Sequence, residues 1–88
     1  MPAYNFTIYS RSYCHLCDDM RDALKVALDH LQCTKYAIEM VDVDADQALL
    51  AEYDELVPVL LASKNEGPAS RLCHYFLDKE RLAAFLAA

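Results

Sequence analysis

The sequence predicts an α/β domain in which a four-stranded mixed sheet is flanked by helices. Short apolar segments rich in β-branched and aromatic residues alternate with amphipathic helical patterns, in the order β-α-β-α-β-β-α. A strand–helix–strand order normally gives a right-handed unit with parallel strands. A turn over residues 64–68 then joins two further strands as an antiparallel hairpin. With 88 residues, the chain has room for a single domain, residues 1–88.

The first half of the chain contains the expected parallel unit. Residues 4–9 alternate in polarity, which predicts the first strand, and residues 36–41 predict the second. Between them, a helix is predicted from Cys14 to about Leu31. Apolar side chains recur there at steps of three and four residues: Leu16, Met20, Leu24, Ala27, Leu28 and Leu31.

The second half is expected to contain two helices and the hairpin. Asp44 is predicted to cap the second helix, because its carboxylate can accept from free N–H groups and Gln47 completes a capping-box pattern. Residues 57–61 and 71–76 predict the third and fourth strands. Asp78 is predicted to cap the last helix. The faces expected to be buried are Ala45, Ala48, Leu49, Tyr53 and Leu56 in the second helix, and Leu82, Phe85 and Leu86 in the last.

Charge and composition exclude several classes of protein. The net charge of −6 repels phosphate backbones, so we expect no nucleic-acid partner. No uncharged run reaches the roughly 18 residues of a membrane span, so we expect no membrane association. The first residues contain no basic or apolar signal segment, and we therefore expect a cytoplasmic location. We also expect a monomer. The single glycine, Gly67, excludes a phosphate-cradling loop.

A metal site is not predicted. Asp42, Asp44 and Asp46 have the spacing that opens a calcium loop. The glycine and glutamate that such a loop requires are replaced by Gln47 and Tyr53. We therefore interpret the three carboxylates as a solvated helix start, where acidic side chains favour the helix dipole.

The four cysteines divide into a C-x-x-C pair, Cys14 and Cys17, and two single residues, Cys33 and Cys73. A framework of two disulfides is typical of small secreted domains, but here 56% of the residues are apolar, enough for a core without such bridges. A C-x-x-C pair at the start of a helix within a βαβ pattern favours a redox dithiol. Two buried structural cysteines, or a metal site, are the alternatives.

The position of Cys14 predicts its chemistry. Free N–H groups and the helix dipole at a helix N-terminus stabilise a thiolate, which lowers the pKa below the about 8.5 of free cysteine. His15, when protonated, lowers this pKa further, whereas the nearby carboxylates of Asp18 and Asp19 oppose it. We predict that Cys14 is the nucleophile and that Cys17, one turn further on, resolves the mixed disulfide.

These features resemble the thioredoxin fold over essentially the whole chain. The resemblance rests on the order of elements, on Cys14-His15-Leu16-Cys17 after the first strand, and on Val57-Pro58 before the third. The short length and the segments 9–17 and 41–44 resemble a branch of small glutaredoxin-like proteins. The resemblance implies thiol–disulfide exchange by the dithiol. It also implies that Pro58 is cis and packs against the Cys14 pair.

The resemblance also implies a glutathione site, from which this chain departs. Arg11 matches the basic residue that lies three positions before the first cysteine in glutaredoxins, and the backbone of Val57 matches a glutathione-binding segment. The two glycines expected before the last helix are replaced by Tyr75 and Phe76. Asp78 matches the acidic residue after those glycines. Glutathione therefore stays open as a co-substrate.

The sequence thus predicts a glutaredoxin-like protein disulfide oxidoreductase with no bound cofactor. Besides the two catalytic cysteines, the expected substrate-binding residues are Arg11, Tyr13, His15, Val57 and Pro58. The expected partners are a disulfide-containing protein or glutathione, and a cellular thiol reductant. The alternatives are a metal or iron–sulfur carrier that uses Cys14, and a non-catalytic binding module with the same fold.

Overall fold

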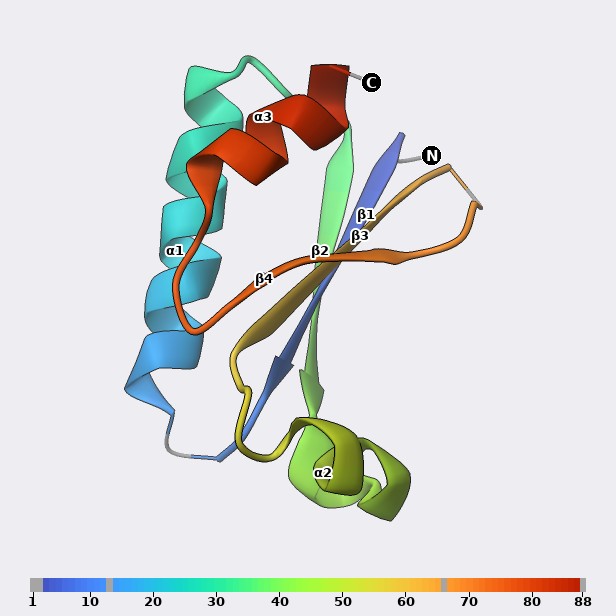
Figure 1. Ribbon diagram of the computed structural model, residues 1–88. Helices are drawn as coiled ribbons and strands as arrows, with labels where there is room; N and C mark the ends of the chain where they lie inside the picture. Colours follow the sequence, from blue (N-terminus) through green and yellow to red (C-terminus); the bar gives the residue numbers. More distant parts are fainter. Residues whose placement is uncertain (1–2, 13, 66, 88) are drawn as a thin grey trace.

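The computed structural model describes residues 3–12, 14–65 and 67–87, and its order of elements is the one predicted (Figure 1). The strands are β1 (Tyr4–Ser10), β2 (Tyr36–Asp42), β3 (Val59–Lys64) and β4 (Ser70–His74). The helices are α1 (His15–His30), α2 (Gln47–Tyr53) and α3 (Lys79–Ala87), and a single 3-10 turn (Val43–Ala45) precedes α2.

The four strands form one mixed sheet in the order β2-β1-β3-β4. β1 and β2 are parallel, as the βαβ order requires, and Ser10 lies opposite Asp42 at their C-terminal ends. β3 is antiparallel to both β1 and β4. The predicted four-stranded mixed sheet is therefore confirmed.

One face of the sheet carries the core. α1 and α3 both lie on this face (Figure 1). The side chains of β1 in the core cluster with them are Phe6 and Ile8. Alternation along a strand explains why these two residues share a face. The helices contribute the buried side chains Met20, Leu24, Ala27, Leu28 and Leu82. As predicted, Phe85 and Leu86 of α3 also pack against this core.

The opposite face of the sheet is only partly covered. α2 lies beyond one end of the sheet (Figure 1), where Tyr53 packs on Tyr9 with ring centroids 4.8 Å apart. The predicted buried face of this helix is wrong, because none of its residues is buried and Ala45 and Ala48 are exposed. A seven-residue helix at the end of a sheet cannot reach the core on the other face.

The predicted start of the second helix is also wrong. The helix begins at Gln47, and its cap is Asp46, whose carboxylate accepts from the N–H groups of Ala48 and Leu49 at 2.9 and 3.3 Å. The carboxylate of Asp44 pairs instead with Arg11. This pairing, formed across 33 residues, is invisible to a local capping pattern.

The hairpin strands are shifted from their predicted bounds. β3 begins at Val59, because Pro58 has no N–H for the ladder and the N–H of Val57 donates to Tyr53 O, at the end of α2. β4 ends at His74, because Tyr75 has a left-handed φ of 65°. Within the described residues, no helix combines the length and apolar character needed to cross a membrane.

Candidate active site

The candidate site lies at the edge of the sheet where β1 and β2 end, β3 begins and β4 ends. The register shows this directly, because Tyr9 pairs with both Val41 and Val59, and Val59 pairs with His74. The loop after β1 leads from this edge into α1. All four strands therefore deliver residues to the surroundings of the C-x-x-C pair.

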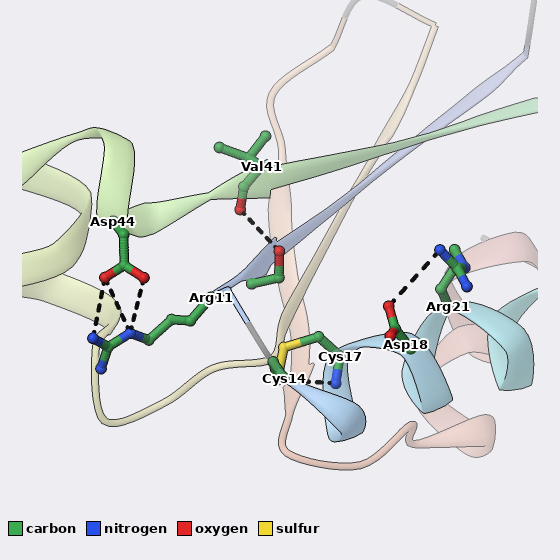
Figure 2. Close-up of a disulfide and its surroundings, with 8 residues drawn as sticks. Arg11, Cys14, Cys17, Asp18, Arg21, Val41 and Asp44 are labelled. Atoms are coloured by element: carbon green, nitrogen blue, oxygen red, sulfur yellow. Dashed lines mark hydrogen bonds and ion pairs between the residues drawn. A yellow bond between two sulfur atoms is a disulfide. The ribbon is translucent and has the colours of Figure 1, made fainter.

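Cys14 and Cys17 form a disulfide across the first turn of α1, with their Cα atoms 5.3 Å apart (Figure 2). Cys14 is the N-cap residue, and its sulfur accepts a hydrogen bond from the N–H of Cys17 at 3.1 Å. Cys14 is half-buried, whereas Cys17 is 1% exposed. The first sulfur is therefore the accessible one, and a helical N–H group is directed at it.

Arg11 lies beside this pair, but its guanidinium group is directed away from the cysteines and toward Asp44 (Figure 2). Its Nε and Nη2 atoms are each 3.1 Å from Oδ1 of Asp44, and Nε is 3.4 Å from Oδ2. Asp44 belongs to the 3-10 turn that follows β2, so the pair joins the ends of the two parallel strands. The cation predicted to bind a substrate carboxylate already has a carboxylate partner.

A groove of about 310 Å³ opens beside the disulfide. Ser10, Arg11, Cys14, His15, Cys17, Asp18 and Met40 line it. Asp42, at the end of β2, accepts from the hydroxyl of Ser12 at 3.3 Å and from the N–H of Asp44 at 2.9 Å. This flank of the disulfide is therefore polar and rich in carboxylates.

The other flank is apolar. A cavity of about 130 Å³ is lined by Leu16, Asp19, Met20, Ala23, Tyr75, Phe76 and Leu77. Leu16, Tyr75 and Phe76 are 41%, 40% and 69% exposed, which is unusual for large apolar side chains. Tyr75 is held in place at both ends, since its N–H donates to Pro58 O at 2.8 Å and its hydroxyl donates to Glu55 O.

The other predicted site residues fall as follows. The Val57–Pro58 bond is cis, as the resemblance implied, and it lies at the same sheet edge as Cys14. His15 begins α1 and lines the groove. Asp78 caps α3, its Oδ1 accepting from Arg81 N–H at 3.1 Å. Tyr13 lies outside the described residues.

The remaining cysteines have free thiols and do not line the groove, although Cys73 lies one residue from the end of β4. Both pack against the core, Cys33 beyond the C-terminal end of α1 and Cys73 in β4. Burial raises the pKa of the Cys73 thiol, an effect that a hydrogen bond from the backbone of Asp78 partly offsets. Within the described residues, no group of three or more His, Cys, Asp or Glu side chains is placed to hold a metal ion.

Sequence reasoning missed two features of the site. One is Asp44 as the partner of Arg11, and the parallel pairing of β1 and β2 was the signal for it, since both residues follow the paired ends of these strands. The other is the exposed group of Leu16, Tyr75 and Phe76, which brings the first turn of α1 to the segment after β4. No local sequence pattern predicts the proximity of these three residues.

Comparisons with known proteins agree with this geometry. A solution structure of protein Ne2328 from Nitrosomonas europaea is 33% identical, with a TM-score of 0.77 over 97% of this chain and 93% of that one. The X-ray structure of XcR50 from X. campestris is 36% identical, with a TM-score of 0.56 over 94% and 97% of the two chains.

More distant structures share the fold alone. Oxidised mitochondrial thioredoxin 3 from Saccharomyces cerevisiae is 12% identical, with a TM-score of 0.65 over 99% of this chain and 79% of that one. No curated protein matches the sequence. The model of the glutaredoxin-like domain family (DUF836) matches residues 5–87. The chain therefore belongs to the glutaredoxin-like domain family (DUF836), and its fold is that of thioredoxin.

Proposed function

We propose that the protein is a thiol–disulfide oxidoreductase whose working group is the Cys14–Cys17 pair. The observation that carries the proposal is the bridge across the first turn of α1, with an accessible sulfur at the N-cap and a buried one behind it. An oxidoreductase needs one sulfur that a substrate can reach and a second that only the first can reach.

In the reduced protein, the Cys14 thiolate attacks one sulfur of a substrate disulfide. A bond forms between Cys14 and that sulfur, and the other substrate sulfur leaves as a thiolate that takes up a proton. Cys17 then attacks the Cys14 sulfur, which closes the protein disulfide and releases the second substrate thiol. Two electrons pass from the dithiol to the substrate.

The fold assists the first step. The Cys17 N–H and the positive end of the α1 dipole stabilise negative charge on Cys14. Because the electrons reside on the two sulfurs, the proposed reaction needs no bound cofactor. A cellular thiol reductant would return the pair to its reduced form. We further propose that the protein works as a monomer in the cytoplasm, where such reductants are abundant.

The decisive experiment has two parts. The reduction potential of the pair is measured by equilibration with dithiothreitol buffers, and the reduction of hydroxyethyl disulfide and of a protein disulfide is then followed. We expect reversible two-electron chemistry and turnover of at least one substrate. A folded protein that reduces neither would contradict the proposal, and a stoichiometric metal or an absorbing cluster in the purified protein would favour a carrier.

A further inference from the structure

We infer that the groove beside Cys14 selects disulfides that carry cationic groups next to the sulfur, and that Asp44 sets this selection by neutralising Arg11. This inference rests on the proposed oxidoreductase function and specifies its substrate class. The inference rests on two observations. The disulfide and Arg11 line the same groove, and Arg11 forms an ion pair with Asp44, which follows the neighbouring strand.

The first step concerns Arg11. Among the described residues that line the groove, Arg11 is the one lysine or arginine. A free arginine here would attract a substrate carboxylate, because a guanidinium fork matches a carboxylate in geometry and charge. With Asp44 in contact through both of its oxygens, the pair presents no net charge.

The second step concerns the charges that remain. In the hydrogen bonds that the structure shows for it, the Asp42 carboxylate accepts from the Ser12 hydroxyl and from the Asp44 N–H. Both donors are neutral, so neither one offsets the negative charge of Asp42. Asp18, which lines the groove, shares Arg21 with Asp22, at N–O distances of 3.8 and 3.4 Å.

The lining itself holds one guanidinium group and one carboxylate, Arg11 and Asp18. Counted with the residues bonded to this lining and to its loop, there are two guanidinium groups, Arg11 and Arg21, and four carboxylates, Asp18, Asp22, Asp42 and Asp44. A cleft whose surroundings carry a net charge of one sign raises the local concentration of ligands of the opposite sign. Anionic disulfides are disfavoured for the same reason. The groove would select a positive charge close to the disulfide. Both a small cationic disulfide and a polypeptide disulfide flanked by Lys or Arg have this feature.

The test uses three disulfides with the same two-carbon arms and different charge: cystamine, hydroxyethyl disulfide and dithiodipropionate. Dithiothreitol-reduced protein, freed of reductant, is mixed with each disulfide, quenched with acid and analysed by mass spectrometry. Because the three leaving thiols differ in pKa, each rate is divided by the rate of a small free thiol with the same disulfide. We expect the corrected rates of wild-type protein to fall in the order cystamine, hydroxyethyl disulfide, dithiodipropionate. Each step should be on the order of 3- to 10-fold, the size of one charge acting across an exposed groove. High salt should compress the series.

The variant Asp44→Asn frees Arg11 while keeping the shape of residue 44. It should accelerate dithiodipropionate and slow cystamine, each by roughly 3- to 10-fold, and leave hydroxyethyl disulfide within about twofold. Adding Arg11→Gln to this variant should remove the gain. Asp29→Asn is the matched control, because it changes the net charge equally at the exposed far end of α1.

The outcomes separate the two proposals. If no disulfide reacts, the oxidoreductase function itself fails. If hydroxyethyl disulfide reacts but neither the small disulfides nor the peptides described below show a charge preference, the selection by Asp44 is overturned. It is also overturned if Asp29→Asn shifts the preference as much as Asp44→Asn.

A second arm uses a pair of disulfide-linked peptides with Lys or Glu beside the cysteine. A charge preference confined to the peptides would identify the substrate as a polypeptide. The same preference in both arms would extend the selection to small disulfides, and its absence from both arms would overturn the inference.

Discussion

The two pairs of cysteines in this chain contain the same thiol group in opposite surroundings. Cys14 and Cys17 lie at the start of α1, where a backbone N–H is directed at sulfur and a groove opens beside the disulfide. Cys33 and Cys73 are half-buried against the core. Position in the fold, more than residue type, therefore decides whether a cysteine is reactive or only packs in the core.

The largest effect should come from removing the first sulfur. Cys14→Ser replaces a thiolate with a hydroxyl that stays protonated, so turnover of any disulfide should fall by about a thousandfold or more, to the uncatalysed rate. Cys33→Ser is the matched control and should retain wild-type turnover. A steady-state assay with hydroxyethyl disulfide measures both, and equal activity of the two variants would erase the distinction between the pairs.

The second prediction separates attack from resolution. Cys17→Ser retains the accessible sulfur but removes the one that releases it, so a mixed disulfide with Cys14 should accumulate to one equivalent. Multiple turnover should fall by about a hundredfold. Intact-mass spectrometry after a single addition of substrate detects the adduct.

Cys73→Ser is the control for this second variant. A serine at position 73 can keep the hydrogen bond from the Asp78 backbone. It should accumulate no adduct beyond the wild-type level. An adduct of the same size in both variants would show that Cys17 is not the resolving residue.

Features that depend on local sequence could be predicted, whereas contacts between distant residues could not. The order of elements, the hairpin and the dithiol follow from local patterns, because periodicity and the C-x-x-C spacing act over a few residues. The ion pair between Arg11 and Asp44 does not, since it depends on how two strand ends meet. The misassigned cap at Asp44 has the same origin: a carboxylate that could serve a helix locally was engaged by a distant arginine.

The third prediction concerns reactivity toward an alkylating agent. In the reduced protein, iodoacetamide at pH 8 should label Cys14 first, because it is accessible and at a helix N-terminus. Cys73 should react more slowly than Cys14, because burial raises the pKa of its thiol. Peptide mapping over time gives the order. Labelling of Cys73 before Cys14 would mean that the helix N-terminus does not activate Cys14.

The smallest effect should appear in the pH dependence of stability. Because burial raises the pKa of Cys73 in the folded state, the folded protein holds this proton more tightly than the unfolded chain. The resulting stability is fully present below the ordinary thiol pKa and is lost as the pH rises through the higher folded value. Burial likewise raises the pKa of Tyr53, which adds a similar loss above its ordinary value of 10.0.

Urea unfolding of the oxidised protein between pH 8 and pH 10.5 isolates the contribution of Cys73, since the bonded Cys14 and Cys17 do not titrate. Wild-type protein should lose more stability over this range than Cys73→Ser, while Tyr53 contributes equally to both. Parallel curves for the two proteins would mean that the Cys73 thiol ionises as freely in the fold as in the unfolded chain. Its burial would then not be what separates it from Cys14.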